Sequence, residues 1–256
     1  MANRFYVINC ENSTKWSPID FAEMFISHLF RDGDDWKVCQ LASGENLPDD
    51  VRTVRGIVIT GSRFNCRDRD TLPWFEPLCE LIRYAAEHGS PKIYGGCFGC
   101  QIVAHALGGE VDYNPTRRFL LKAENVRFLD CKCGCMGLPS LPLELEGRCC
   151  CNGLKLLVSH GDCVCKLPPN AKLLANSDTC EAEIYLTGSN NNIIGCQSHP
   201  EFDFKYAVEE RIWKSVVELN KRLNEEEVAI AQQSFAEYDG ADAKYFMNWV
   251  SEFLHS

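Results

Sequence analysis

The chain has 256 residues, of which 45% are hydrophobic and 24% are charged, and its formal net charge is -10 at pH 7. This length can bury one large core, and the acidic balance argues against a nucleic-acid-binding surface, which needs a basic face. No apolar run approaches the roughly 18 residues of a membrane span, and the first residues lack the charged-then-apolar layout of a secretory signal.

The first part of the chain alternates between strand and helix patterns. Short apolar runs predict strands, and apolar residues at three- or four-residue spacing predict helices. In chain order we expect a strand over Phe5–Cys10, a helix over Asp20–Phe30, strands over Trp36–Leu41 and Gly56–Thr60, a helix over Pro73–His88, a strand over Lys92–Gly95 and a helix over Phe98–Leu107. This alternation predicts an α/β fold with a mostly parallel sheet and helices on both faces.

From about Phe119 the pattern changes to shorter strands, which predict a small antiparallel addition leading back to the sheet. The expected strands are Leu120–Leu129, Leu154–Val158, Leu173–Ala175, Ala182–Leu186 and Ile193–Gln197. Residues 204–256 have helical spacing, and a last helix is expected over Lys244–Leu254. Since we find no repeat and no linker, we predict a single domain over 1–256.

The 16 cysteines are unusual for a chain of this size. Because a disulfide framework belongs to small secreted proteins, we expect reduced thiols and a cytoplasmic location. Several of the cysteines are concentrated in a predicted surface insertion over Cys131–Cys151. Its C-x-C-x-C and C-C-C runs differ from the C-x₂-C spacing of zinc ribbons, so we predict no metal site, with zinc binding kept as the weaker alternative. No cofactor is expected.

The run from Gly95 to Gln101 has the form G-x-C-x-G between a predicted strand and a predicted helix. This is the nucleophile-elbow pattern with cysteine in place of serine. The turn would lift the Cys97 sulfur above the sheet edge and place it at a helix N-terminus, where the helix dipole favours the thiolate. The Phe98 amide is then free to stabilise an oxyanion.

A catalytic thiol also needs a base and a group that orients the base. The run Gln-Ser-His-Pro-Glu supplies both, because residues two apart in an extended segment project to the same side. We therefore expect His199 to act as base and then acid, and Glu201 to orient its imidazole. A third element, Thr60-Gly61-Ser62, follows a buried strand, so the Gly61 amide is a second candidate oxyanion donor.

These three motifs, in this order and spacing, resemble the signatures of class I glutamine amidotransferases. The similarity covers most of residues 4–215 and includes His160-Gly-Asp162 and Glu181-Ala-Glu183. Among stand-alone members the chain is most similar to plant γ-glutamyl peptidases, cytosolic enzymes that cleave γ-glutamyl groups from glutathione conjugates. The resemblance implies a flavodoxin-like sheet, an acyl-enzyme on Cys97, and Gln101 close to the glutamyl group of a small-molecule substrate.

Other polar residues near these motifs carry weaker hypotheses. Ser62 is a candidate substrate-binding residue, while His160 is more simply a structural hydrogen-bonding group. Arg117 and Arg118 could pair with a substrate carboxylate, although a solvated pair of charges is the simpler interpretation. The sequence departs from the peptidases at Cys100, where they often have histidine, and a second thiol so close to Cys97 raises the question of oxidative pairing.

The leading hypothesis is a γ-glutamyl hydrolase or peptidase, because the triad is present without an ammonia-accepting domain. The first alternative is a glutaminase subunit that supplies ammonia to a separate synthetase. The second is a non-enzymatic binding or redox-sensing module built on the cysteine-rich insertion.

Overall fold

The computed structural model describes residues 3–16, 18–129 and 153–256. The predicted insertion over Cys131–Cys151 lies outside the described residues, and so does the proposed metal or redox role of its cysteines. Among the described residues, no helix is long and apolar enough to cross a membrane.

A nine-stranded sheet organises the fold, with strand order β2-β1-β3-β4-β11-β10-β9-β6-β7. Strands β2, β1, β3, β4 and β11 pair in parallel, whereas β10, β9, β6 and β7 continue the sheet in antiparallel fashion. The α/β fold with a mostly parallel sheet and an antiparallel addition, predicted from the sequence, is therefore confirmed. The strands are β1 (Asn3–Ile8), β2 (Asp34–Cys39), β3 (Gly56–Ile59), β4 (Lys92–Gly96), β5 (Glu110–Tyr113), β6 (Leu120–Phe128), β7 (Leu154–His160), β8 (Asp162–Lys166), β9 (Lys172–Asn176), β10 (Ile184–Thr187) and β11 (Ile193–Cys196).

Helices cover both faces of the parallel part, and the strands have apolar residues on both sides for that reason. In β1, Phe5 and Val7 join the core on one face, and Tyr6 and Ile8 join the core on the other. Helices α1 and α5 pack together on the first face, and α2 packs against α3 on the second. The helical segments are α1 (Pro18–Leu29), η1 (Leu41–Ser43), η2 (Cys66–Thr71), α2 (Phe75–His88), α3 (Phe98–Ala106), η5 (Phe204–Leu219), α4 (Glu225–Ala236) and α5 (Ala241–His255).

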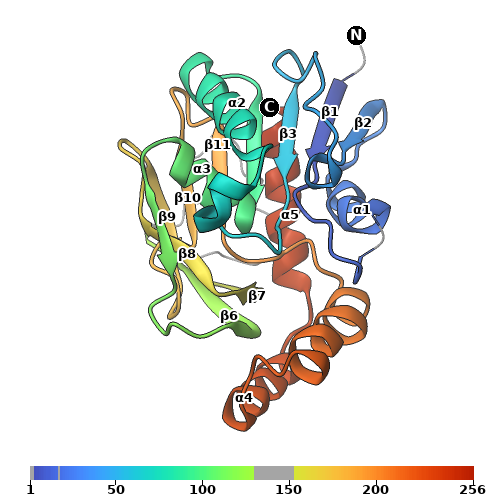
Figure 1. The fold of residues 1–256 in the computed structure, drawn as a ribbon, viewed down its shortest axis with the longest axis vertical. Coiled ribbons are helices and arrows are strands. Elements are labelled where there is room, and N and C mark those ends of the chain that lie inside the picture. The colour runs from blue at the N-terminus through green and yellow to red at the C-terminus, as the bar shows by residue number, and fades with distance from the viewer. Residues whose placement is uncertain (1–2, 17, 130–152) are drawn as a thin grey trace.

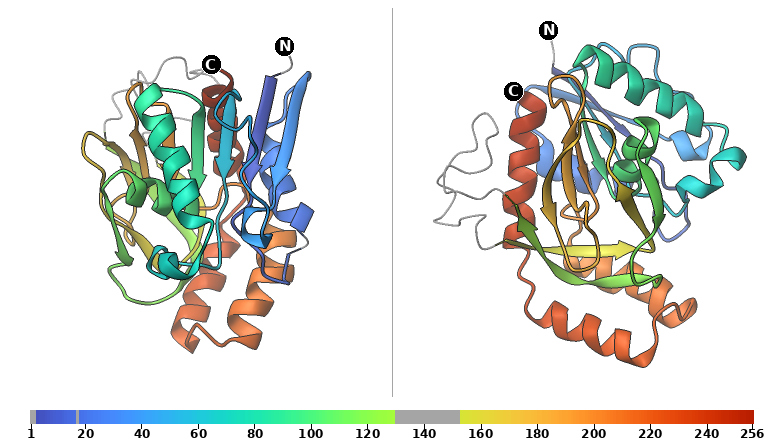
Figure 2. Two further views of the ribbon diagram at one scale, coloured as in Figure 1. Left: turned by 45° about the horizontal axis from the view of Figure 1, so that its top comes forward. Right: turned by 90° about the vertical axis from the view of Figure 1, so that its left-hand side faces the viewer.

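The C-terminal region has more structure than its helical periodicity indicates. Segment η5 and helix α4 form a hairpin that projects beyond the sheet at the end towards which β3 points, and α5 then returns along the sheet (Figures 1 and 2). The break between η5 and α4 is set by Asn224, whose side chain accepts a hydrogen bond from the Glu227 amide and caps α4. The hairpin matters for function because it reaches the end of the sheet where β3 and β4 terminate.

The prediction missed one element of the sheet structure. Strands β5 and β8 form a separate two-stranded antiparallel sheet. This sheet lies beside α3 and brings the segment around Asp162 next to the helix that begins after Cys97.

Candidate active site

The turn between β4 and α3 holds Cys97 in a backbone conformation that side chains rarely adopt. Its φ is 49° and its ψ is -104°, and such strain costs about 1–3 kcal/mol. Two glycines make the turn possible. A Cβ on Gly95 would lie 2.6 Å from the backbone of Gly99, and a Cβ on Gly99 would lie 2.2 Å from the carbonyl oxygen of Ile59. The glycines of the G-x-C-x-G pattern are therefore required by sterics.

The three sequence motifs meet at one edge of the sheet. Thr60, Cys97 and Gln197 each follow the last residue of a strand, and these strands, β3, β4 and β11, are neighbours in the parallel part. The carboxyl ends of adjacent parallel strands form the usual ligand-binding edge of an α/β sheet. Residues separated by more than a hundred positions in the sequence are thus brought together by strand order.

Two backbone amides near Cys97 are available to a ligand. Within the described residues, neither the Gly61 nor the Phe98 N–H donates a hydrogen bond to another group of the protein. Gly61 lies against the predicted triad, because a Cβ placed on it would be 3.2 Å from His199 Cε1 and 3.6 Å from Cys97 Cβ. Gly61 therefore has an unpaired N–H donor, and its close contact with His199 disfavours any side chain at this position.

His199 and Glu201 are buried and hydrogen-bonded to each other. The Nδ1–Oε1 distance is 2.7 Å, so Nδ1–H donates to the carboxylate and Nε2 is left for the side of Cys97. Phe202 stacks on the imidazole ring with a centroid distance of 4.1 Å, and the His199 amide donates to the Leu157 carbonyl at 2.8 Å. Ring and backbone are therefore both held in place.

The electrostatics of this histidine favour its charged form. Burial disfavours the imidazolium, but the negative charge of the Cys97 sulfur, followed by that of Glu201, outweighs burial and raises the pKa of His199 to about 10. A side-chain hydrogen bond with Cys97 acts in the same direction. The arrangement therefore favours a protonated imidazole, the form that can give a proton to a leaving group.

A chain of amide groups connects the thiol to the neighbouring strand β8. Gln197 donates from Nε2 to the Cys97 sulfur at 3.4 Å. Gln101 donates from Nε2 to Gln197 Oε1 at 3.0 Å and to the Asp162 carbonyl at 2.9 Å. Gln101, predicted to bind substrate, thus also holds Gln197 against the sulfur of Cys97.

Ser62, the other predicted substrate-binding residue, shapes the loop after β3. Its hydroxyl donates to the Cys10 carbonyl at 2.5 Å and accepts from the Phe64 amide at 3.1 Å. The side chain lines the cavity described next, although both its bonds serve the turn.

A cavity of about 370 Å³ opens above Cys97. The predicted nucleophile and both predicted substrate-binding residues line it. Residues of the hairpin form part of its wall. Its walls come from the loops after β1, β3 and β5, from the β7–β8 turn and from η5. The lining residues are Lys15, Ser62, Arg63, Phe64, Asn65, Arg67, Cys97, Phe98, Gln101, Tyr113, Arg117, Arg118, Phe119, Ser159, His160, Gly161, Asp162, Ser215, Val216, Asn220 and Arg222.

Two buried acceptor atoms in this cavity have no protein partner among the described residues. They are Nε2 of His160 and Oδ2 of Asp162. His160 donates from Nδ1 to the Asp162 carbonyl at 3.0 Å, and burial, together with nearby His199, lowers the pKa of His160 to about 3. His160 is therefore neutral, and it has both the structural hydrogen bond and a buried acceptor atom without a partner among the described residues.

All ten cysteines of the described ranges are free thiols, Cys97 and Cys100 among them. Burial raises the pKa of the Cys100 thiol well above its usual value. In the same ranges, no group of three or more histidine, cysteine or acidic side chains is arranged to hold a metal ion.

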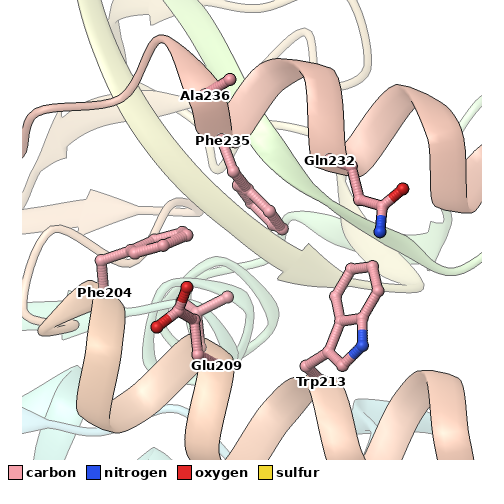
Figure 3. Close-up of a pocket in the computed structure, with 7 residues that line it drawn as sticks. Phe204, Glu209, Trp213, Gln232, Phe235 and Ala236 are labelled. Carbon is pink, nitrogen blue, oxygen red and sulfur yellow. The ribbon is translucent and has the colours of Figure 1, made fainter.

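A second hollow, of about 430 Å³, lies away from this site, between η5 and α4 (Figure 3). Aromatic side chains of Phe204, Trp213 and Phe235 point into it. It shares no lining residue with the cavity above Cys97, so it forms no part of the candidate active site.

The fold and this site define a protein of the amidotransferase type, in which an elbow cysteine and a histidine–glutamate pair meet at the sheet edge. A model of the class-I glutamine amidotransferase family matches residues 37–219. The chain belongs to this family.

The curated relatives include both gamma-glutamyl peptidases and glutamine-hydrolyzing GMP synthases. The chain is 30% identical to gamma-glutamyl peptidase 4 of Arabidopsis thaliana over 186 residues, which cover 72% of this chain and 68% of that protein. It is 29% identical to gamma-glutamyl peptidase 5 of the same plant, over 91% of this chain and 87% of that protein. A glutamine-hydrolyzing GMP synthase of Bacteroides fragilis is 26% identical, over 64% of this chain but only 28% of that protein.

Solved structures share the fold. A glutamine amidotransferase from Thermotoga maritima superposes with a TM-score of 0.72 and 16% identity, with both chains covered completely. This likeness extends over the C-terminal helices as well as the sheet.

Sequence motifs did not reveal every residue around the thiol. Gln197 belongs to the quoted Gln-Ser-His-Pro-Glu run, and its adjacency to His199 was the available signal for a role. Lys15 and Arg222 gave no such signal, because they lie in loops remote in sequence from every motif. Arg117 and Arg118, which the sequence had offered as possible substrate contacts, also line the cavity. Arg118 is paired with Glu227 at 2.8 Å.

Proposed function

We propose that the protein is a cysteine-dependent γ-glutamyl hydrolase or peptidase that cleaves γ-glutamyl amide bonds, with glutathione or its conjugates as substrates. The observation that carries this proposal is that Cys97 lines a cavity, with His199, which is hydrogen-bonded to Glu201, and the unpaired Gly61 and Phe98 amides beside it. The similarity to gamma-glutamyl peptidases over most of both chains supports it.

In the proposed reaction the Cys97 thiolate attacks the γ-carbonyl carbon, and the Gly61 and Phe98 amides stabilise the resulting oxyanion. His199 then gives its Nε2 proton to the leaving nitrogen as the C–N bond breaks, which leaves a γ-glutamyl thioester. Water attacks the thioester after giving a proton to His199, and the C–S bond breaks to release glutamate. Glu201 keeps the imidazole in the tautomer and orientation that both steps need.

The cavity has groups suited to the zwitterionic end of a γ-glutamyl substrate. The unpartnered acceptors of His160 and Asp162 suit its ammonium group, and the cationic side chains of the lining suit its carboxylate. Gln101 lies between these groups and Cys97, which supports its expected place beside the glutamyl chain.

The test is to incubate the protein with glutathione, a glutathione S-conjugate and glutamine, and to measure glutamate release and the acyl-enzyme by mass spectrometry. We expect release from at least one of the two peptides, a mass increase of one γ-glutamyl group on the peptide containing Cys97, and neither signal with Cys97→Ala. The absence of cleavage for all three substrates would overturn the proposal.

The similarity to a glutamine-hydrolyzing GMP synthase favours one second candidate, a glutaminase that delivers ammonia to a synthetase partner. It predicts little activity of the isolated chain and co-purification with a synthetase from its own cells. The free thiols of the described cysteines support the further proposal that the protein works in the reducing cytoplasm.

A further inference from the structure

The cavity above Cys97 reverses the charge balance of the whole protein. The chain has a net charge of -10, yet the cavity lining contains six lysine or arginine residues and one carboxylate, Asp162. A local excess of one sign inside a hollow concentrates ligands of the opposite sign. The positive lining therefore indicates that the cavity binds a negatively charged ligand.

Two of these six cations already have carboxylate partners. Arg67 pairs with Asp162 at 2.9 Å and with Asp112 at 3.3 Å, and Arg118 pairs with Glu227 at 2.8 Å. The other four are in no ion pair with any residue in the described ranges. They are Lys15, Arg63, Arg117 and Arg222.

Three of the unpaired cations come from different parts of the chain, and the charges of two of them affect the pKa of the third. Burial lowers the pKa of Lys15, the positive charges of Arg222 and Arg63 lower it further, and Glu11 and Cys97 oppose this. Glu11 forms no direct ion pair with Lys15 within the described residues, and its Oε1 accepts hydrogen bonds from the next two backbone amides, at 2.9 and 2.7 Å. We call Lys15, Arg63 and Arg222 the cationic rim.

Aromatic rings position the rim. Arg222 lies over the ring of Phe119, with 3.9 Å from Cζ to the centroid, and Arg63 lies over Phe64 at 5.1 Å. A guanidinium stacked in this way keeps its N–H groups free at its edge, in the fork geometry that fits a carboxylate. The rim is thus pre-organised for an anion, because Asp162 acts on Arg222, and Glu11 on Lys15, without forming a direct ion pair in the described ranges.

The charge of a γ-glutamyl group cannot satisfy this excess. The group carries one ammonium and one carboxylate, so it is neutral overall, and glutamine is neutral with it. An anionic substrate must carry its additional negative charge on the other side of the scissile amide, in the leaving group.

We propose that Lys15, Arg63 and Arg222 bind a carboxylate of the leaving group, so that the enzyme selects γ-glutamyl amides of amino acids or peptides over glutamine. This rests on the proposed γ-glutamyl hydrolase activity and names the substrate class of the same site. Arg222 comes from the loop after η5, so the C-terminal hairpin supplies part of the specificity.

The test compares two substrates that differ only in the charge of the leaving group, γ-glutamyl-alanine and γ-glutamyl-alaninamide. We expect the carboxylate form to have a kcat/KM at least about 10-fold higher at low salt, since several charged contacts add. This ratio should fall as NaCl is raised towards 1 M, because salt screens partly exposed charges.

Variants that each remove one positive charge show which residues produce the preference for the carboxylate substrate. In Lys15→Gln, Arg63→Gln and Arg222→Gln the ratio should fall about 3- to 5-fold each, chiefly through KM, which is the scale of one partly exposed ion pair. Lys214→Gln is the matched control, because Lys214 is an exposed cation of η5 that does not line the cavity, and its ratio should equal that of the wild type.

The outcomes separate the two proposals. Equal kcat/KM for the acid and the amide in the wild-type enzyme would overturn the rim's role while leaving γ-glutamyl hydrolysis standing, and this measurement needs no variant to fold. Unchanged ratios in all three folded rim variants would overturn the residue assignment. No cleavage of either compound, of glutathione or of glutamine would overturn both proposals.

Discussion

Gly61 and Gly99 are both next to the Cys97 turn, but they exclude a side chain for different reasons. A Cβ on Gly99 would meet a backbone carbonyl at 2.2 Å, and backbone cannot move aside cheaply. A Cβ on Gly61 would meet the imidazole of His199 at 3.2 Å, which a small shift of the ring could relieve. One glycine therefore protects the fold, and the other protects the position of the predicted base.

Alanine substitutions should separate these two roles. We expect Gly99→Ala to lower the free energy of unfolding by about 3 kcal/mol, as overpacking does. Gly61→Ala should change it by less than about 1 kcal/mol but lower kcat/KM about 10-fold or more, because a small misplacement of a proton-transfer group is costly. Urea unfolding and steady-state kinetics measure the two effects.

The control for these variants is Gly161→Ala. A Cβ at Gly161 would have only Phe119 nearby, at 3.9 Å, so its unfolding free energy should stay close to that of the wild type. The distinction drawn here would be wrong if Gly61→Ala lost stability as severely as Gly99→Ala.

At the scale of the element, the segment after β11 is anchored from below by a buried carboxylate. Glu183 is fully buried, and its side chain accepts hydrogen bonds from the hydroxyls of Ser198 and Ser177. Its backbone carbonyl also accepts from the Gln197 amide at 2.8 Å. Glu183 therefore supports, from the loop before β10, the two residues that directly precede the predicted base.

This support depends on pH. Burial raises the pKa of Glu183 to about 7, Glu124 adds to the rise, and the hydroxyl hydrogen bonds oppose it. Because the pKa is higher in the folded chain than the usual value of 4.5, the stabilisation from the protonated acid is complete below about pH 4.5 and is lost as pH rises through about 7.

We expect Glu183→Gln to remove this part of the pH dependence. Relative to the variant, the wild type should lose on the order of 3 kcal/mol of unfolding free energy between pH 4.5 and pH 8. Chemical denaturation across that range measures it. Glu80→Gln, at an exposed position of α2, should keep the wild-type slope, and parallel curves for Glu183→Gln and the wild type would contradict the assignment.

The elements that the sequence predicted well are those with long or fully apolar patterns. Helix α2 and strands β1, β3 and β4 were found within a few residues of their bounds, because burial on two faces leaves a continuous apolar run. Strands β5 and β8 were missed. Their four and five residues include exposed charged or polar positions, and their pairing joins segments about fifty residues apart, which no local pattern encodes.

The residues of the candidate site likewise fall into those that the sequence predicted and those that it did not. The elbow and the His-Pro-Glu run could be identified because turn sterics and a two-residue spacing constrain neighbours in sequence. Lys15 and Arg222 could not be identified, because their place in the cavity depends on how the loop after β1 and the C-terminal hairpin pack. The local arrangement of the predicted triad was therefore predictable, and the composition of the cavity walls was not.

At the scale of the whole molecule, the cysteines of the described ranges differ mainly in environment. Burial raises the pKa of Cys10, Cys100 and Cys196 well above the usual value, which makes them poor nucleophiles. Cys165 is exposed, but it has no histidine partner among the described residues. Cys97 lines an open cavity and faces an imidazole that stays protonated at neutral pH.

Iodoacetamide should therefore modify Cys97 before the others at pH 7, at least about 10-fold faster than Cys165, because the thiolate is the reactive form. Peptide mass spectrometry of briefly treated native protein measures the rates. His199→Ala should bring the rate at Cys97 down towards that of Cys165. Equal rates in the wild type would favour the redox-module alternative over a catalytic thiol.

The position of β11 in the sheet also has a consequence for how the chain folds. This strand, Ile193–Cys196, lies between β4 and β10, so the edge of β4 stays open until a segment made about a hundred residues later is inserted beside it. Contacts this distant in sequence form slowly, and an apolar strand edge favours aggregation until its partner strand has paired with it. During synthesis on the ribosome, the proposed nucleophile would thus emerge well before the proposed base, and the sheet and the candidate site would be completed by the same insertion.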